Sequence, residues 1–442
     1  MTHPTHAVPT LARDFIDLEE RYGAHNYHPL PVVLTHGAGV YLVDESGRRY
    51  LDMMSAYSAV SFGHGHPVLV KALTEQAQRL AITSRAFHSN NLGVYCKYIT
   101  EYFGYQRVLP MNTGAEAVET ALKLCRKWAY EVKKLPKDTA EIVVCRNNFH
   151  GRTTTIVSFS IDPDAYNNYG PFTPGFVVIP YNDAEALAKV LDEHPHVAGF
   201  LVEPIQGEAG AYVPDEGYLK KCYDLCRAHN VLFIADEVQT GMGRTGRFLF
   251  TETWPRRPDA VLLGKMLGGG LVTTAAMLTK QELFDRAYGQ NFETAEGHNA
   301  TFSGNAVSCV AALAALELVT PQLMAENLRK GSYLREQLTA AIGGSPLVAE
   351  VRSWGMILGI ELRAAEHPWL SFDHFGMGDL ARHPTVGLLL CRRLYRRGFY
   401  GFVCGHNWSV LRLQPRFTIT QERMDQFICA LKEEIEYLCA LN

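Results

Sequence analysis

The chain has 442 residues, of which 47% are hydrophobic and 20% are charged, a composition typical of folded proteins and not of disordered ones. Its formal net charge of −4 gives no overall attraction to nucleic acid or to an anionic membrane, so we expect neither as a partner. The ten cysteines form no CxxC pair and no zinc-type pattern, no apolar run of about 18 residues occurs, and the first residues do not resemble a secretion signal. We therefore expect a protein of the reducing cytoplasm with no metal centre and no membrane span.

The first predicted element in chain order is a short antiparallel meander. Residues 32–54 alternate apolar and polar side chains around turn signals at 37–39 and 45–47. From about residue 68, helical segments alternate with short apolar runs, which is typical of a parallel sheet with crossover helices. The strands predicted from this pattern are 141–145, 176–180, 197–202, 231–235 and 260–263.

Ala115–Trp128 is the clearest crossover helix, because its apolar residues recur with helical spacing. After about residue 318 the regular alternation ends, and an irregular stretch near 364–385 precedes a last helix near 421–440. The pattern predicts an α/β protein whose large domain has a mostly parallel central sheet flanked by helices, with a second, smaller α+β domain.

Three charged residues stand where ligands of open α/β sheets bind, beyond the carboxyl ends of strands. Glu203 directly follows the predicted strand at 197–202, and Asp236 directly follows the one at 231–235. Lys265 comes two residues after the strand at 260–263. A lysine and an acid over one crevice suit pyridoxal phosphate, whose aldehyde forms a Schiff base with lysine and whose pyridine nitrogen is kept protonated by a carboxylate. The alternative is that Lys265 is an ordinary surface lysine, and spacing alone does not separate the two.

Other segments offer sites for anions. The turn at 112–115 opens the predicted helix and would direct backbone N–H groups at a phosphate, although such turns also serve as plain caps. Phe149 and Arg152 follow the strand at 141–145 and offer an aromatic face and a guanidinium that can clamp a carboxylate, or form an ordinary ion pair. Arg412 is a second candidate clamp, and Glu208 could neutralise such an arginine when no acid is bound.

Three further patterns have plainer interpretations. We expect His64 and His66 to be turn residues and not metal ligands, because no other ligand spacing accompanies them. The arginines within 392–397 have the spacing of the solvated face of a helix. Cys222 and Cys226, one helical turn apart, are expected to be buried free thiols.

Several motifs together resemble the fold-type I, class III pyridoxal-phosphate aminotransferases, and within them the ornithine δ-aminotransferases. The resemblance covers about residues 20–442 and rests on the motifs at 22–29, 55–60, 112–114, 203–208, 235–241 and 264–265. It implies a large cofactor-binding domain at 68–318, an N-terminal arm and part of the small domain at 1–67, and the rest of the small domain at 319–442. It also implies a homodimer with shared active sites.

The resemblance also implies a role for each candidate residue. Lys265 carries the cofactor and moves the proton, and Asp236 pairs with the pyridine nitrogen. The other implied cofactor contacts are Gly114 and Ala115 through their backbone N–H groups, Phe149 stacked on the ring, Gln239 at the ring hydroxyl, and Thr301 on the phosphate of the neighbouring subunit. The implied substrate contacts are Tyr27 and Arg152 at the α end of ornithine, Tyr57 lining the pocket, and Arg412, which pairs with Glu208 until it binds 2-oxoglutarate.

The implied reaction moves the δ-amino group of L-ornithine to 2-oxoglutarate, giving glutamate 5-semialdehyde, which cyclises to pyrroline-5-carboxylate, and glutamate. Another diamine or ω-amino acid as donor, such as lysine, putrescine or acetylornithine, is an alternative. So is an amino-acid racemase, epimerase or aminomutase on the same fold. A non-catalytic binding protein is disfavoured because Lys265 and Asp236 are both present.

The sequence departs from the family pattern at four places. His150 stands where ornithine enzymes commonly have another aromatic residue, the segment 292–299 looks longer, 364–385 is an insert, and Arg416 adds a base beside Arg412. We expect these changes to leave the cofactor site untouched and to bear on the choice of amino donor.

Overall fold

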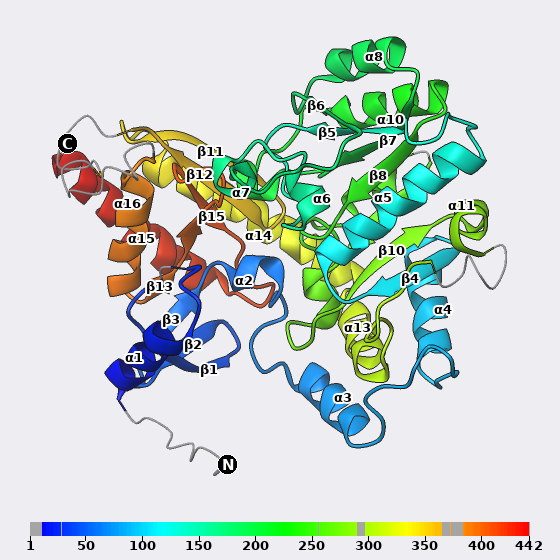
Figure 1. Ribbon diagram of the computed structural model, residues 1–442. Coiled ribbons are helices and arrows are strands. Elements are labelled where there is room, and N and C mark those ends of the chain that lie inside the picture. Colours follow the sequence, from blue (N-terminus) through cyan, green and yellow to red (C-terminus); the bar gives the residue numbers. More distant parts are fainter. Residues whose placement is uncertain are drawn as a thin grey trace.

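A seven-stranded sheet forms the centre of the computed structural model, which describes residues 11–27, 29–254, 256–289, 297–364, 372 and 383–441 (Figure 1). The strand order is β4-β10-β9-β8-β7-β5-β6, and only β10 runs antiparallel to its neighbours. The strands are β4 (Arg107–Met111), β5 (Glu141–Cys145), β6 (Phe176–Ile179), β7 (Val197–Val202), β8 (Leu232–Asp236), β9 (Ala260–Leu263) and β10 (Ala275–Thr279). The five predicted strands and the mostly parallel sheet are confirmed, while β4 and β10 were not predicted.

Helices cover both faces of this sheet. The main ones are α3 (Pro67–Ala77), α4 (Leu92–Phe103), α5 (Gly114–Glu131), α8 (Ala184–Glu193), α10 (Tyr218–Ala228) and α13 (Ala306–Leu318). The predicted crossover helix is α5, which extends past both ends of its predicted range and packs on β9 and β10.

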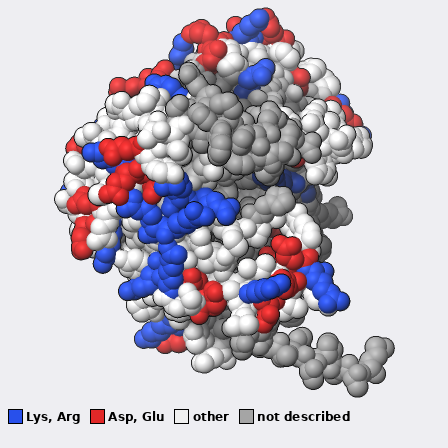
Figure 2. Space-filling view, turned by 90° about the vertical axis from the view of Figure 1, so that its left-hand side faces the viewer, with Lys and Arg blue, Asp and Glu red and all other residues white. Residues whose placement is uncertain are grey.

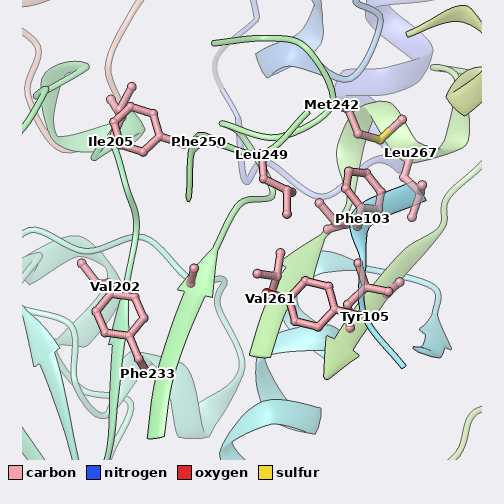
Figure 3. Packing of buried hydrophobic residues seen from close by; sticks show 14 of the residues in the cluster. Phe103, Tyr105, Val202, Ile205, Phe233, Met242, Leu249, Phe250, Val261 and Leu267 are labelled. Carbon is pink, nitrogen blue, oxygen red and sulfur yellow. The ribbon is translucent and has the colours of Figure 1, made fainter. Parts of the chain in front are cut away.

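Alternate residues of each central strand point to opposite faces of the sheet. In β8, Phe233 belongs to the core on one face and Ile234 to the core on the other. Figure 3 shows Phe233 with Val202 and Val261 from the two neighbouring strands, beneath the loop that carries Leu249. Burial on both faces explains why these strands read as continuous apolar runs.

A smaller unit contains two further sheets. The predicted meander is confirmed as β1 (Leu34–Ala38), β2 (Tyr41–Asp44) and β3 (Arg49–Asp52), and β13 (Phe399–Tyr400) pairs parallel with β3. The second sheet has the order β11-β12-β15-β14, with β11 (Val348–Trp354), β12 (Ile357–Leu362), β14 (Phe402–Val403) and β15 (Val410–Leu413).

Three helices pack on these two sheets. They are α14 (Pro321–Ile342), α15 (Val386–Arg396) and α16 (Gln421–Leu441), the last of which was predicted at 421–440. One apolar core joins Leu51 and Met53 from the N-terminal part to Leu411 and Leu413 from the C-terminal part. Segments from both ends of the chain therefore share one core, while the boundaries at 67 and 318 stay predictions.

The remaining α-helical segments are α1 (Ala12–Tyr22), α2 (Ser55–Ser58), α6 (Thr154–Val157), α7 (Pro163–Tyr166), α9 (Gly207–Gly210) and α11 (Gln281–Phe284). Among the described helices, none is long and apolar enough by itself to cross a membrane. The pair α13 and α14 has the necessary length and hydropathy only when the two helices are taken together, across a 68° bend.

The arginine cluster lies on the surface of the small unit. Arg393 pairs with Glu434 of α16, and Arg397 with Glu433 at 2.6 Å. Figure 2 shows this side of the molecule, where basic side chains gather in the middle of the face with acidic ones beside them. Arg392, Arg396 and Arg397 are exposed, so the interpretation as a solvated helix face is confirmed for them, while Arg393 is half-buried against Glu434.

Candidate active site

The residues that end the central strands meet in one cavity. Asp236 is the last residue of β8, Glu203 directly follows β7, and Lys265 follows β9 after one glycine. The cavity has an empty volume of about 620 Å³, in the range of small-molecule sites. Its lining consists of Gly114, Ala115, Phe149, His150, Gly151, Glu203, Ile205, Asp236, Val238, Gln239 and Lys265. Six of the predicted cofactor residues are therefore neighbours, and Lys265 is not a surface lysine.

Asp236 is held at the bottom of the cavity by two hydrogen bonds. Its Oδ2 accepts from Nδ1 of His150 at 2.7 Å, and its Oδ1 accepts from the backbone N–H of Val238 at 3.1 Å. Burial lowers the pKa of His150, but the hydrogen bond and charge of Asp236 outweigh burial and raise that pKa above its ordinary value. The two hydrogen bonds fix the direction of the Asp236 carboxylate.

This contact corrects one expectation about the departures. His150 was expected to bear on the amino donor and to leave the cofactor site untouched, but it lines the cavity and bonds directly to Asp236. Glu203 lies behind it and accepts from the backbone N–H of Phe149 at 3.0 Å. Burial raises the pKa of Glu203 to about 7, although the charge of His150 opposes this.

The first turn of α5 forms the opposite wall of the cavity. Thr113 caps the helix by accepting from the N–H of Glu116 at 3.2 Å, and the carboxylate of Glu116 accepts from the N–H of Thr113 at 3.1 Å. The N–H groups of Gly114 and Ala115 lie inside the first turn, where a helix has no carbonyl of its own to offer them. They can therefore bind an anion, assisted by the helix dipole.

Lys265 reaches the cavity from a strained turn. Its backbone has φ of 46°, in the left-handed region that non-glycine residues rarely adopt, and it opens a short helical turn at Lys265–Gly268. Burial lowers the pKa of Lys265 to about 8, and the charge of Glu208 opposes this. The neutral amine, the form that attacks a carbonyl, is consequently far more abundant near physiological pH than for an ordinary lysine.

A buried ion pair closes one side of the site. Nη1 of Arg412 bonds to Oε1 of Glu208, and both side chains are buried. Burial alone would raise the pKa of Glu208, but the charges of Arg412 and Lys265 lower it to about 2. The backbone N–H of Gly405 donates to the second carboxylate oxygen at 3.1 Å. Glu208 is thus an ionised acceptor held from two sides.

Tyr57, Tyr27 and Arg412 lie together. The guanidinium carbon of Arg412 is 5.0 Å from the centre of the Tyr57 ring, and burial together with the nearby Tyr27 raises the pKa of Tyr57. Arg152 is exposed, with its guanidinium carbon 5.5 Å from the centre of the Phe149 ring. Within the described part of the chain Arg152 forms no ion pair, so its guanidinium is open to a ligand. Thr301 is exposed and lies outside the cavity.

Comparisons with known proteins identify the family. Residues 22–435 match the class-III aminotransferase family. The chain is a class-III aminotransferase. The ornithine aminotransferase of Schizosaccharomyces pombe is 50% identical, the match covering 96% of this chain and 94% of that one. The crystal structure of the ornithine aminotransferase of Toxoplasma gondii has a TM-score of 0.88 at 38% identity and covers 98% of this chain and 96% of that one. The acetylornithine aminotransferase of Elizabethkingia anophelis has a TM-score of 0.82 at 44% identity, covering 96% and 99%.

Class-III aminotransferases use pyridoxal phosphate, and the cavity of this aminotransferase fits that group. A carboxylate, a lysine and the open first turn of a helix surround one cavity. On the backbone side, a Cβ added at Gly114 or Gly264 would contact the methyl groups of Val238, at 3.4 and 3.3 Å respectively. Gly114 and Val238 both line the cavity, so the absence of a side chain at Gly114 leaves this wall of the cavity open beside Val238.

The other departures of this aminotransferase lie away from the cavity or outside the described residues. Nη2 of Arg416 donates to Asp52 at 2.6 Å, so this base is committed to a buried ion pair. Most of the segments 292–299 and 364–385 falls outside the described residues. His64, expected to be a turn residue, lies 3.4 Å from the same Asp52.

Sequence reasoning missed His150, Val238 and Gln414 as members of the site. His150 directly follows Phe149 beyond the end of β5, and this position was a usable signal. Val238 was hidden because an apolar residue after a strand is not distinctive. Gln414 contacts Gln239 from the other unit, a pairing that only the tertiary structure shows.

Proposed function

We propose that this aminotransferase transfers the δ-amino group of L-ornithine to 2-oxoglutarate, giving glutamate 5-semialdehyde, which cyclises to pyrroline-5-carboxylate, and glutamate. The observation that carries the proposal is the buried pair of Glu208 and Arg412 beside Lys265. Relatives named as ornithine aminotransferases over nearly the whole chain support the same reaction.

The cofactor residues would each supply one contact. Pyridoxal phosphate, when bound, provides a carbonyl for the amine and an electron sink for the charge that develops during proton transfer. Asp236 would hold the proton at the pyridine nitrogen, and Lys265 would bind the carbonyl carbon and then move the proton. The N–H groups of Gly114 and Ala115 would bind the phosphate, Phe149 would cover the ring, and Gln239 would contact the ring hydroxyl.

The closed Glu208–Arg412 pair would select which amino group of ornithine reacts. A paired Arg412 offers no free charge to the α-carboxylate, so that end of ornithine turns away from it. Arg152, which has no carboxylate partner among the described residues, would bind the α-carboxylate with help from Tyr27. This leaves the δ-amino group at the end that faces Lys265.

The second half of the reaction needs a different charge state of the same pocket. 2-Oxoglutarate carries two carboxylates, and the one beside its keto group needs a cation near Lys265. Glu208 would leave Arg412, which then binds this carboxylate in a bidentate manner. One pocket would thus accept a δ-amine and an α-keto acid in turn without binding an α-amino acid in the first half.

A homodimer with shared active sites is part of the proposal. Thr301 is exposed and is not among the residues that line its own cavity, so Thr301 of the partner subunit would bind the phosphate here. The neighbouring surface is apolar: Phe87 is 70% and Phe302 is 58% exposed. The two segments are adjacent, because Gly304 lies against Leu92. An apolar surface of this kind marks an interface in a well-folded protein.

A single half-reaction tests the proposed donor. The pure holoenzyme is mixed with ornithine in the absence of any oxo acid, and the visible absorption of the bound cofactor is followed while the product is identified. Spectral conversion with appearance of pyrroline-5-carboxylate supports the proposal. An unchanged spectrum with intact ornithine contradicts it, and racemised or rearranged ornithine indicates the isomerase alternative.

N-Acetylornithine is the second candidate donor, favoured by the 44% identity to an acetylornithine aminotransferase of known structure. The same half-reaction distinguishes the two, because N-acetylornithine gives a semialdehyde whose blocked nitrogen prevents cyclisation. Lysine and putrescine complete the panel. The donor with the highest second-order rate constant for spectral conversion is identified as the substrate.

A reducing compartment such as the cytoplasm also belongs to the proposal. All ten cysteines are free thiols, and Cys222 and Cys226 are buried as expected. Oxidised, disulfide-linked protein from cells would contradict this.

A further inference from the structure

Three buried polar side chains alternate along the end of β15 and the residues that follow it. Arg412, Gln414 and Arg416 all have 0% exposed surface, while Leu411 and Leu413 point the other way into the apolar core. The two arginines have acidic partners, since Arg412 bonds to Glu208 and Arg416 bonds to Asp52. The middle residue, Gln414, has no role in the reaction as described so far.

Gln414 continues a chain of hydrogen bonds that begins at the Glu208–Arg412 pair. Nε2 of Gln239 donates to Oε1 of Glu208 at 3.3 Å, and Nε2 of Gln414 donates to Oε1 of Gln239 at 3.1 Å. All these side chains are buried. The order of the hydrogen-bonded side chains is Gln414, Gln239, Glu208, Arg412.

The chemistry of Glu208 fixes the direction of the whole chain. An ionised carboxylate only accepts hydrogen bonds, so Gln239 must turn its NH₂ group toward Glu208. Its carbonyl oxygen then faces Gln414, which must in turn present its own NH₂ group. The orientation of both amides therefore follows from the contacts and not from a free choice of side-chain rotamer.

The backbone of Gln414 is anchored independently of the substrate pocket. Its N–H donates to the carbonyl of Met53 at 2.8 Å, and the N–H of Met53 donates to the carbonyl of Tyr400 at 2.8 Å. Met53 also belongs to the apolar core of the small unit. Gln414 is thus anchored by its backbone just after β15, while the Glu208 side chain has to move during the proposed reaction.

We propose that Gln414 is a positioning residue of the transamination reaction, which holds the amide of Gln239 in one orientation when Glu208 leaves Arg412. Without Gln414, departure of Glu208 would free the Gln239 amide to turn over and present its carbonyl to the cavity. The link to catalysis rests on the proposed contact between Gln239 and the cofactor ring. The hydrogen-bond chain itself does not depend on the identity of the amino donor.

The variant Gln414→Met tests this role because it keeps the length of the side chain and removes the donor. In the holoenzyme without substrate, we expect the pH midpoint of the cofactor's visible absorption change to shift by about 0.5 to 1 unit, as loss of one hydrogen bond to a polar group predicts. We expect kcat to fall roughly three- to tenfold with KM for the donor changed less than about twofold.

Leu413→Met is the matched control, since Leu413 directly precedes Gln414, is buried, and faces the apolar core and not the chain of hydrogen bonds. It should leave the spectral midpoint and kcat at their wild-type values. A Gln414→Met enzyme with the wild-type spectral midpoint and wild-type kcat overturns the proposal. A loss confined to Tm, matched by the control, also overturns it, because that result describes a purely structural residue.

Reversal of the chain is a sharper test that needs no substrate. Gln414→Glu replaces the donor by an acceptor, which turns the Gln239 amide and places its carbonyl against Glu208. The double variant Gln414→Glu with Glu208→Gln restores a donor at position 208, so the reversed chain is again complete. If the two substitutions acted independently, the shifts in spectral midpoint and Tm of the double variant would be the sum of the two single-variant shifts. We expect smaller shifts than this sum, with values closer to those of Glu208→Gln alone.

The hydrogen bonds that join Gln414 to Glu208 pass through Gln239, so we expect the coupling between positions 414 and 208 to depend on Gln239. The two single variants and the double variant can be measured again in a Gln239→Ala background. There we expect the effects at positions 414 and 208 to be additive, with no coupling between them. Additive effects in the wild-type background, or coupling that survives Gln239→Ala, overturn the proposal. These readouts are independent of ornithine, so failure here is distinct from failure of the proposed donor.

Discussion

Arg412 and Glu208 show how one buried pair can decide which amine reacts. Their charges compensate each other, and the pKa of Glu208 is lowered to about 2, so the pair is closed throughout the physiological range. A buried pair of this kind is costly to break on one side, because the remaining charge stays unpaired. Because opening the pair costs free energy, binding of an α-carboxylate at Arg412 is disfavoured while the pair is closed.

Glu208→Ala should open the pocket to α-amino acids. Arg412 then has no acidic partner and binds the α-carboxylate of glutamate or ornithine, so we expect the ratio of δ- to α-transamination to fall by about tenfold or more. Product analysis after reaction with ornithine measures this ratio. Glu216→Ala, at an exposed position, is the control. An unchanged ratio would show that the pair does not govern regiospecificity.

Lys265 makes cofactor capture dependent on pH. Because burial lowers its pKa to about 8, the amine of the cofactor-free protein is mostly charged at pH 7 and mostly neutral at pH 9. We expect the rate of cofactor uptake to rise about tenfold over this interval, with a midpoint near pH 8. Stopped-flow absorbance at several pH values gives the profile. A midpoint above pH 10 would contradict the lowered pKa, and Lys265→Arg should abolish the covalent step.

The element that carries Tyr57 is a turn of unusual backbone. All four residues of α2, Ser55 to Ser58, have φ between 46° and 74°, although none is glycine. Each left-handed residue costs roughly 1–2 kcal/mol, so the turn exists only because its surroundings hold it. Asp52 does so by accepting from the N–H groups of Met54 and Ser55 at 2.9 and 2.8 Å, and Arg416 holds Asp52.

Arg416→Met should therefore destabilise the protein and loosen the Tyr57 turn. Loss of one partner leaves the fully buried Asp52 without its guanidinium, a change that costs about 3–5 kcal/mol in buried pairs. Urea unfolding measures this loss. The double variant with Asp52→Asn, which keeps the side-chain oxygen for the two N–H groups, should regain part of it. If Arg416→Met is as stable as the wild type, the pair does not support the turn.

The whole molecule brings the site together from distant parts of the chain. Met53 near the start of the chain and Leu413 near its end share one core, and this packing sets Tyr57 and Arg412 next to each other. The cofactor cavity belongs to the other unit, at the ends of β7, β8 and β9. Function consequently depends on how the two units pack, and in the proposed dimer also on Thr301 of the partner subunit.

Phe302→Asp should separate the proposed dimer. A charge in the centre of an apolar interface is poorly tolerated, so we expect a monomer in sedimentation velocity at micromolar concentration and at least about a tenfold loss of activity. Tyr437→Asp is the control, since Tyr437 is 45% exposed on α16. A dimeric and active Phe302→Asp protein would place the interface elsewhere.

Residue patterns alone determined the order of the central strands along the chain and the chemistry at their ends. Strands buried on both faces appear as apolar runs, and the charged residues that follow them must lie at one edge of a parallel sheet. Asp236 and Lys265 were predictable for this reason, and the first turn of α5 was predictable because a turn opens the helical pattern of that segment. β10 was not, because an antiparallel strand after Lys265 has no signature that separates it from a buried helix.

Only the tertiary structure decided which buried polar groups pair with each other. Hydrogen bonds such as those between His150 and Asp236, Gln414 and Gln239, or Arg416 and Asp52 join residues 86 to 364 positions apart. Local patterns carry no information about such distances, because periodicity describes which face a residue occupies and not what it meets there. The positions of charged and apolar residues thus follow from the sequence, while the direction of each hydrogen bond follows from the packing that buries it.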